Sequence, residues 1–515
     1  MRLPRYFLRF FLLALIVQCS VFLRAEQEQG VESESLPSGS ETALQDVETE
    51  ETKTVPAFSV EDIEAAKADL KNVSLQSVAK KYNEMKYPVA YVIGNPKTKE
   101  RRTFFAFVHN KSITVRRGKG RVRKLALDRL DVIEKDIHLN LTLWNWRNTA
   151  YTVMVDAPEG AEEWVVLANL YPMQSTKTED IYVPYSPKLH ETAPDLINAG
   201  TVYLDDVYKK AVSILASLPI AWRYRYNDKP PHLSGDLTQK ILGNTVISGG
   251  GKPLFEVTDD PVLGKFFLKR LVQCIVAIEH IDHDEFRAHD AAWLIEKVLV
   301  TVGANRGMAY YAAVSSAGAG GLAQFIKSTY NAVRGSKGYP EAKLTRDFVK
   351  GMRDHVNAMV AMILLIDREL AVLTKNPTIA AYLQSSATEE ESRLQQEFGF
   401  PSVEAMRLWL LATAAYNGGT GPGGEKIARA IRARGAAWFQ SSASELDAIR
   451  DKMGNTRSQL KRAKSSARKA ELQKELNELQ KTYNRLRQGT LSPRTGETPI
   501  YLQKSLPAYA FFAEE

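Results

Sequence analysis

Cysteine and long apolar runs are both scarce in this chain of 515 residues. Its only cysteines are Cys19 and Cys274, which excludes a framework of internal disulfides. The apolar stretch between Arg9 and Arg24 is shorter than the ~20 residues that a membrane-spanning helix needs. With 44% hydrophobic and 25% charged residues, the remainder has the composition of a protein that buries ordinary cores.

The first 25 residues have the pattern of a secretory signal peptide. A basic start with Arg2 and Arg5 precedes the apolar run 10–17, and Ala25 ends a possible cleavage site. The alternatives are an uncleaved membrane anchor and a lipoprotein attached through Cys19.

Removal of this segment lowers the net charge from +8 to +4, because four arginines leave with it. So mild a charge does not argue for a nucleic-acid partner. A single remaining thiol, Cys274, suits a bacterial periplasm better than a eukaryotic secretory route. We therefore expect a periplasmic or cell-envelope protein without nucleic acid and without a transmembrane span in the mature chain.

Composition and periodicity divide the rest of the chain. Residues 26–56 hold nine acids, one lysine and no aromatic residue, which is typical of a disordered tether. β-rich runs follow a helical segment, and from about 216 the pattern is helical, with Asp260-Pro261 as one expected helix start. The expected segments are a signal peptide (1–25), a disordered acidic linker (26–57), an N-terminal α+β domain (58–215), a mainly helical domain (216–440), a basic helical insertion (441–494) and a C-terminal segment that completes the helical domain (495–515).

Several chemistries lack their sequence signatures. No Gly-Lys-Ser/Thr follows a glycine loop at the spacing that binds nucleotides, and no HExxH occurs. His280 and His283 stand one helical turn apart beside His289 and four acids, which is a possible metal site. The acids can equally cap two helices across a turn. We expect no cofactor and no metal.

The stretch "SSAGAGGLAQFIKSTY" places a glycine loop directly before a helix. It resembles the Ser-x-x-Gly-Ala-x-Gly-Leu-Met-Gln-x-x-x-x-Thr signature of soluble-type lytic transglycosylases, with Ala323 in place of Met. The matching positions are Ser315, Gly318, Ala319, Gly321, Leu322, Gln324 and Thr329.

Two further segments are similar to elements of the same family, in the same order. "AAYNGGTGPGG" contains Tyr416 and Asn417, and "GETPIYLQKSLPAY" contains Tyr501. The resemblance covers roughly residues 260–510. It implies a lysozyme-like helical domain, so the expected fold is α+β and multidomain, with a mixed N-terminal domain and a helical coiled-coil insertion. It also implies a peptidoglycan lytic transglycosylase that acts on glycan strands.

The family uses one Glu, which protonates the bond between N-acetylmuramic acid and N-acetylglucosamine and then activates the C6 hydroxyl to form a 1,6-anhydro product. The usual Glu-Ser about a dozen residues before the Gly-Ala is missing, and Arg306 stands there. Glu279, in "QCIVAIEHIDHD", lies on the apolar face of a helix and is our preferred acid. Glu296, in "AAWLIEKVLVTVG", is the alternative. A third interpretation is that either glutamate is a buried structural residue paired with an arginine or a backbone amide.

The resemblance also suggests which residues bind the substrate. Rival functions are a muramidase that uses water, with Asp282, Asp284 or Asp290 as a second acid, and a non-catalytic peptidoglycan-binding scaffold. The N-terminal domain or the basic insertion could bind cell-envelope proteins, although a charge run is usually a solvated face. The expected substrate-binding residues are Ser315, Gln324, Tyr416, Asn417 and Tyr501.

Overall fold

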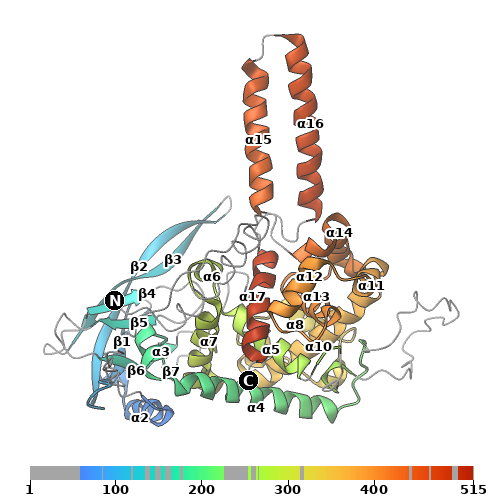
Figure 1. The fold of residues 1–515 in the computed structure, drawn as a ribbon. Helices are drawn as coiled ribbons and strands as arrows, with labels where there is room; N and C mark the ends of the chain where they lie inside the picture. Colours follow the sequence, from blue (N-terminus) through green and yellow to red (C-terminus); the bar gives the residue numbers. More distant parts are fainter. Residues whose placement is uncertain are drawn as a thin grey trace, which may run out of the picture. The chain divides into compact units, whose positions relative to one another are not determined.

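The structure is a computed structural model, shown in Figure 1. It describes residues 58–83, 85–117, 120–133, 140–144, 152–156, 164–173, 178–224, 253–256, 262–264, 266–311, 313, 318–439, 443–462, 465–489 and 497–513. The signal peptide and acidic linker expected at 1–57 lie outside these residues. The described chain combines many helices with a small antiparallel sheet, which confirms the α+β class in its coarse form.

The sheet has five strands in the order β3-β2-β1-β6-β7, all antiparallel to their neighbours, and β4 and β5 form a separate pair. The central strand β1 is buried on both faces: Ala90 and Val92 pack under helix α2 (Val60–Leu70), whereas Tyr91 and Ile93 pack in a cluster on the other face. The strands are β1 Lys86–Gly94, β2 Arg101–Arg117, β3 Gly120–Val132, β4 Asn140–Trp144, β5 Thr152–Asp156, β6 Val165–Met173 and β7 Thr178–Tyr182.

From α3 onward the described chain is helical. Two helices, α10 and α13, are buried around most of their circumference and form the centre of a large apolar cluster. The α-helices of this part are α3 Pro187–Thr192, α4 Asp195–Ala216, α5 Phe267–Glu279, α6 His283–Ala288, α7 Ala291–Asn305, α8 Lys327–Arg334, α9 Phe348–Arg353, α10 His355–Thr374, α11 Pro377–Gln384, α12 Glu389–Glu397, α13 Val403–Gly418, α14 Glu425–Arg434, α15 Ala443–Arg462, α16 Ser466–Gly489 and α17 Glu497–Ala513.

Helix α5 begins later than the sequence pattern indicates. Asp260 and Pro261 lie outside the described residues, and the helix starts at Phe267. Gly264 and Phe266 have φ angles of 74° and 60°, in the left-handed region, which no α-helix can continue through. The expected helix start at Asp260-Pro261 is therefore wrong by about two turns of helix.

Helices α4 and α7 pack against each other and contribute to two cores. Leu204 of α4 and Leu299 of α7 belong to the large helical cluster, whereas Leu196 and Val300 belong to the cluster beneath the sheet. The two helices approach so closely that a Cβ on Gly303 would collide with the Leu196 carbonyl oxygen. Helix α4, which lies inside the range 58–215 expected for the N-terminal domain, thus packs with the helical part as well.

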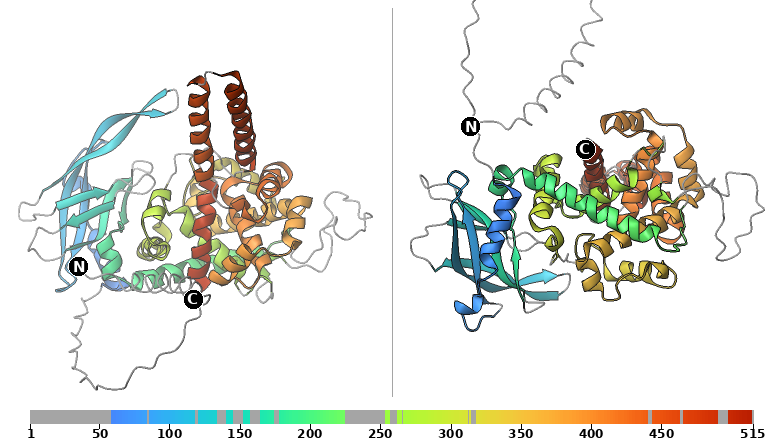
Figure 2. Two further views of the ribbon diagram at one scale, coloured as in Figure 1. Left: turned by 45° about the horizontal axis from the view of Figure 1, so that its top comes forward. Right: turned by 90° about the horizontal axis from the view of Figure 1, so that it is seen from below.

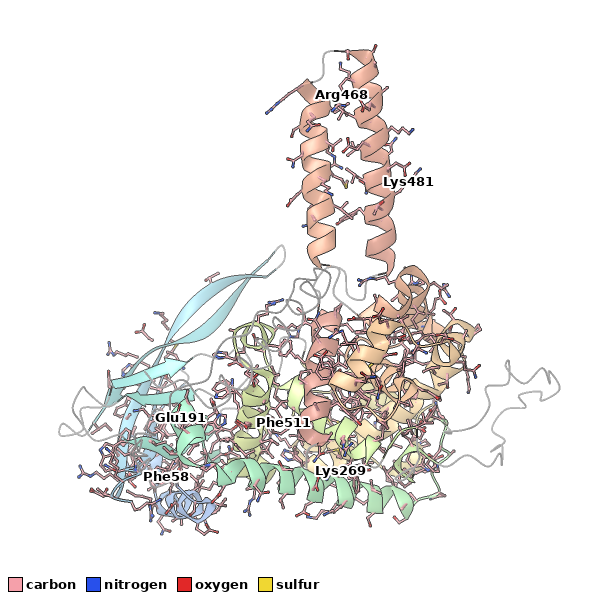
Figure 3. The ribbon with its side chains drawn as sticks, in the orientation of Figure 1. Phe58, Glu191, Lys269, Arg468, Lys481 and Phe511 are labelled. Carbon is pink, nitrogen blue, oxygen red and sulfur yellow. The ribbon has the colours of Figure 1, made fainter. Side chains whose placement is uncertain are left out.

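The basic insertion folds as a hairpin of two helices, α15 and α16 (Figure 1). Met453 and Leu472 are buried between them, and Thr456 donates a hydrogen bond to Glu475 across the seam. Arg468 and Lys481, labelled in Figure 3, are exposed and pair with acids of their own helix. Across the residues that the structure describes, no helix is long and apolar enough to cross a membrane.

Candidate active site

Helix α5 carries Glu279 as its last residue. The helix is amphipathic in sequence but is buried nearly all round, because even Gln273 is covered and donates a hydrogen bond of 2.8 Å to Asp205. Glu279 itself is half-buried, and His280 follows it in a non-helical conformation. The carboxyl group thus stands where a buried helix ends, which leaves it partly accessible.

Two tyrosines that the sequence analysis selected lie beside this carboxyl group. The Tyr501 hydroxyl donates a hydrogen bond of 2.9 Å to Glu279 Oε1. Burial raises the pKa of Tyr501, and the charge of Glu279 raises it further. Burial likewise raises the pKa of Tyr416, again with a contribution from Glu279. Both phenols therefore stay protonated and act as hydrogen-bond donors.

The glycine loop folds into a tight turn before α8. Gly320 and Phe325 form an isolated β-bridge, and Gly321 N donates to Ala313 O at 3.1 Å. Gly321 has a φ of 70°, and a Cβ there would collide with the Met352 carbonyl oxygen. The turn thus requires glycine at 321, both for its left-handed conformation and for the close approach of α9.

Two residues close to Glu279 hold this turn in place. The Tyr416 hydroxyl donates to Ala323 O at 2.6 Å, and His280 Nε2 donates to Leu322 O at 3.0 Å. Two consecutive carbonyl groups of the loop are therefore anchored, one by α13 and one by the residue that follows Glu279. Gln324 comes next, half-buried, with its side chain donating to Gly321 O at 2.8 Å.

His280 acts as a structural clamp in its neutral form. Its ring stacks on Tyr310, with the ring centroids 3.5 Å apart and the planes 8° from parallel. Burial lowers the pKa of His280 to about 3, and the hydrogen bond to Leu322 opposes that shift only in part. The ring keeps its Nε2 proton for Leu322 O over the whole neutral range.

Helix α17 contains the third motif and contacts the end of α5 and the residues that follow it. One turn beyond Tyr501, the buried Lys504 donates to Ile281 O and to His283 Nδ1, the latter at 2.8 Å. At the start of α17, Thr498 donates to Asn417 Oδ1 at 3.0 Å. The last motif thereby connects to both the acid and the second motif.

Glu296 occupies different surroundings. It lies on α7, and its Oε2 is hydrogen-bonded at 3.1 Å to Nε2 of His190, which belongs to α3. The His190 ring stacks on Trp293, and its Nδ1 lies 3.2 Å from the Tyr185 hydroxyl. Glu296 therefore takes part in a polar contact between α7 and the segment before α4, and not in the group around Glu279.

The residues proposed as a metal site or as a second acid are dispersed. His280 and His283 turn to different partners, Leu322 O and Lys504, and Asp290 accepts from two backbone amides as the cap of α7. Asp282 is half-buried at the start of α6, and the Asp284 side chain lies outside the described part of the molecule, as does Ser315. In the part of the chain that is described, no three His, Cys, Asp or Glu side chains gather in a metal-binding arrangement.

Sequence reasoning missed three contributors: Tyr310, Lys504 and the pair formed by Arg353 and Tyr311. Arg353 donates a hydrogen bond of 3.0 Å to the Tyr311 hydroxyl and lies over the ring of Tyr311. Arg353 directly follows Met352, which packs against Gly321 of the turn. None of them stands within helical spacing of Glu279 in the sequence. Lys504 alone carried a signal, since it follows Tyr501 by three residues inside the third motif.

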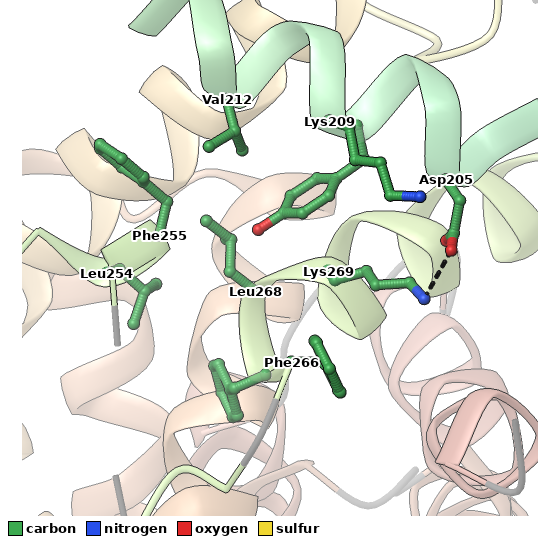
Figure 4. A pocket seen from close by; sticks show the side chains of 10 residues that line it. Asp205, Lys209, Val212, Leu254, Phe255, Phe266, Leu268 and Lys269 are labelled. Carbon is green, nitrogen blue, oxygen red and sulfur yellow. Dashed lines mark ion pairs between the residues drawn. The ribbon is translucent and has the colours of Figure 1, made fainter. Parts of the chain in front are cut away.

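A cavity of about 410 Å³ lies at the opposite end of α5 (Figure 4). It is lined by Val212 of α4 and by Phe255, Phe266 and Leu268, and the ion pair between Lys269 and Asp205 borders it. Lys269, the last lining residue on α5, stands ten residues before Glu279, which corresponds to roughly 15 Å along the helix. This apolar cavity is therefore separate from the candidate site.

Three sequence motifs that lie far apart in the chain thus meet around Glu279, and Glu296 lies outside that group. No protein-family model, curated protein or solved structure matches this chain.

Proposed function

We propose that this chain is a peptidoglycan lytic transglycosylase with a lysozyme-like helical domain, acting in the periplasm or cell envelope. One observation carries the proposal. The glycine loop, the Tyr416 segment and the Tyr501 segment, which resemble three family motifs, are joined to one another by hydrogen bonds, and the Tyr501 hydroxyl bonds the carboxyl group of Glu279. Such convergence of distant residues on one partly accessible acid is typical of an active site.

In the proposed reaction Glu279 serves first as acid and then as base. Its proton passes to the glycosidic oxygen as the bond from C1 of N-acetylmuramic acid breaks, and N-acetylglucosamine leaves with a free hydroxyl. The resulting carboxylate takes the proton of the muramic acid C6 hydroxyl, whose oxygen bonds to C1. The product is a 1,6-anhydro sugar, the proton is back on Glu279, and no water is consumed.

The surroundings of Glu279 suit both roles. The Tyr501 hydroxyl holds Oε1 and stabilises the carboxylate that exists between the two proton transfers. Tyr501 is only 2% exposed, so we assign it to positioning the acid and not to contact with sugar. Gln324 directly follows Ala323, whose carbonyl group Tyr416 anchors, and we assign Gln324 as a candidate contact for the glycan.

The decisive experiment compares two single substitutions. Purified sacculi are incubated with the chain lacking residues 1–25, and the soluble products are identified by mass spectrometry. We expect 1,6-anhydro-muropeptides from the wild type and from Glu296→Gln. Glu279→Gln should lose about 10²- to 10⁴-fold in rate, as expected for a general acid, with an unchanged circular dichroism spectrum.

Each other outcome replaces the proposal with a named rival. Products with free reducing ends would make the protein a muramidase. Loss of activity in Glu296→Gln alone would move the acid to α7. Binding to sacculi without any release by the wild type would leave a non-catalytic scaffold.

A further inference from the structure

The cavity at the start of α5 is large for a space between packed helices. Helix α4 crosses the helical part, as the view from below in Figure 2 shows. The cavity of about 410 Å³ is lined by α4, by the start of α5 and by the one-turn helix Leu254–Glu256. Side chains normally fill such a space, so that few voids exceed the size of a water molecule. A volume of this size lies within the range of roughly 300 to 1,000 Å³ that small-molecule sites have.

One end of the cavity is apolar. Val212 of α4, Phe255 and Leu268 lie together there in Figure 4. Phe255 and Leu268 are buried members of the large helical cluster, and the Phe255 ring packs on Trp222, with the ring centroids 4.8 Å apart. Apolar cavities stay dry and take up hydrocarbon groups. This end of the cavity therefore suits the hydrocarbon part of a ligand.

The other end of the cavity carries two amino groups and one carboxyl group (Figure 4). Lys269 Nζ pairs with Asp205 Oδ2 at 2.8 Å, and Gln273 donates a hydrogen bond of 2.8 Å to Asp205 Oδ1. Both oxygens of this carboxyl group are thus bound by α5. Lys209 is exposed one turn further along α4, and in the part of the chain that the structure describes no acid pairs with it. This end of the cavity therefore keeps one positive charge.

Tyr208 adds a hydrogen-bond donor to the lining. Burial raises the pKa of its phenol, and the charge of Asp205 raises this pKa further, so the hydroxyl stays protonated. Among the described residues, none accepts a hydrogen bond from this hydroxyl. A ligand with a negatively charged oxygen group would accept from Tyr208 and pair with Lys209, and charge-assisted hydrogen bonds of this kind are stronger than neutral ones.

Phe266 brings an apolar ring to the charged end of the cavity. Its side chain is 51% exposed, and its φ of 60° lies in the left-handed region that residues other than glycine rarely adopt. Lys269 Nζ lies 5.5 Å from the centroid of this ring. Backbone strain of this kind is concentrated at ligand-binding and active sites. The exposed ring thus provides apolar surface that the hydrocarbon part of a ligand would cover.

These features together select one class of ligand. A neutral hydrocarbon would leave Lys209 and Tyr208 without an acceptor, and a wholly hydrophilic anion would leave the apolar end empty. We propose that the cavity binds a small amphipathic anion, whose carboxylate or phosphate group contacts Lys209 and Tyr208. Its short hydrocarbon body lies between Val212, Phe255 and Leu268. This inference is independent of the proposed activity, because the cavity shares no residue with the site around Glu279.

The test is titration calorimetry of the chain lacking residues 1–25 with three probes that share one hydrocarbon body. The probes are octanoate, octyl phosphate and octanol, each kept below the concentration at which it forms micelles. We expect at least one of the two anions to bind about tenfold or more tightly than octanol, and the tighter anion identifies the head group. Lys209→Gln should weaken binding of that anion about tenfold and leave octanol binding unchanged. Tyr208→Phe should weaken binding of the anion about fivefold.

The matched control is Lys210→Gln, which removes the same charge from the next residue of α4. Lys210 is exposed and lies outside the cavity lining, so this variant should bind like the wild type. Val212→Phe fills the apolar end and should abolish binding of all three probes, with thermal unfolding as the check that the variant is folded.

Four results would overturn the proposal. Neither anion binds the wild type at millimolar concentration, or octanol binds as tightly as both anions. Lys210→Gln loses as much affinity as Lys209→Gln, or folded Val212→Phe binds as the wild type does.

Discussion

At the scale of single residues, the hydrogen bond from Tyr501 to Glu279 makes the sharpest prediction. Tyr501→Phe removes the donor at 2.9 Å from Oε1 and leaves the ring in place. We expect the rate of anhydro-product release to fall about tenfold and the free energy of unfolding to fall by about 1 kcal/mol, the usual value for one hydrogen bond. Initial rates on sacculi and thermal unfolding measure the two effects.

The matched control is Tyr509→Phe on the same helix. Its hydroxyl contacts Arg270 at 3.4 Å and not the acid, so this variant should keep a nearly normal rate. Equal rate losses in Tyr501→Phe and Tyr509→Phe would mean that the Tyr501 hydroxyl serves only the packing of α17.

The sequence could name the two acids but could not choose between them. Glu279 and Glu296 both lie on apolar helix faces, which is a local property that the periodicity of the chain reveals. What distinguishes them is their partners: Tyr501 stands 222 residues from Glu279, and His190 stands 106 residues from Glu296. Such pairings follow from tertiary packing and leave no trace in local spacing.

At the scale of elements, the conformation of the glycine loop depends more on glycine at position 321 than on glycine at position 318. Gly321→Ala places a Cβ against the Met352 carbonyl oxygen at a φ of 70°. We expect a loss of about 2 to 5 kcal/mol in the free energy of unfolding, from left-handed strain and overpacking together. Activity should fall as well, because the turn presents the carbonyl groups that Tyr416 and His280 anchor.

Gly318→Ala is the comparison within the same loop. Gly318 has a φ of 79°, but in the described part of the chain, its two chain neighbours aside, no atom lies within 4 Å of the position that its Cβ would take. Only conformational strain then remains, about 1 to 2 kcal/mol. Urea unfolding of both variants measures the two losses in the free energy of unfolding. If these losses are similar, the close approach of Met352 is not what constrains the loop.

The type of most elements could be predicted, and their ends could not. The pattern of α10 and α13 is long, apolar and free of proline, so their helical state follows from the sequence. The start of α5 did not follow, because Asp260-Pro261 is a good local capping signal that the left-handed Gly264 and Phe266 override. The two helices of the basic insertion were expected and are present.

At the scale of the whole molecule, α4 and α7 tie the sheet to the helical part. Their residues enter both apolar clusters, and Asn305 at the end of α7 bonds both the N–H and the C=O of Val183, at 2.7 and 2.9 Å. The boundary expected near 216 falls at the end of α4, whereas β7 already ends at Tyr182 and α3 begins at Pro187, so the change from strands to helices comes earlier in the chain. The sequence pattern also does not reveal that α4 packs on both sides. We therefore expect the sheet and the helical part to influence each other's stability.

Two histidines, the buried His355 and the half-buried His280, make that stability depend on pH. Burial lowers the pKa of His280 to about 3 and that of His355 to about 4. In the unfolded chain both pKa values lie near 6.5. Between pH 6.5 and 4 the unfolded state therefore binds up to two more protons than the folded state, and the free energy of unfolding falls as the pH falls. From pH 6.5 to 5 the expected loss is about 3 kcal/mol.

The substitution His355→Gln isolates one of the two contributions. His355 Nε2 donates to Ala309 O at 2.9 Å, and a glutamine amide can still donate there but does not titrate. Thermal unfolding between pH 7 and 5 should show a slope against pH about half as steep in the variant as in the wild type. Buried carboxylates affect stability at lower pH. Burial alone would raise the pKa of Glu391, but hydrogen bonds from Arg407 outweigh burial and lower this pKa to about 2. The stability that Glu391 contributes is therefore lost only as the pH falls below the ordinary pKa of 4.5. An unchanged slope in His355→Gln would show that other groups take up the protons, and the neutral form of the buried rings would no longer account for the acid sensitivity.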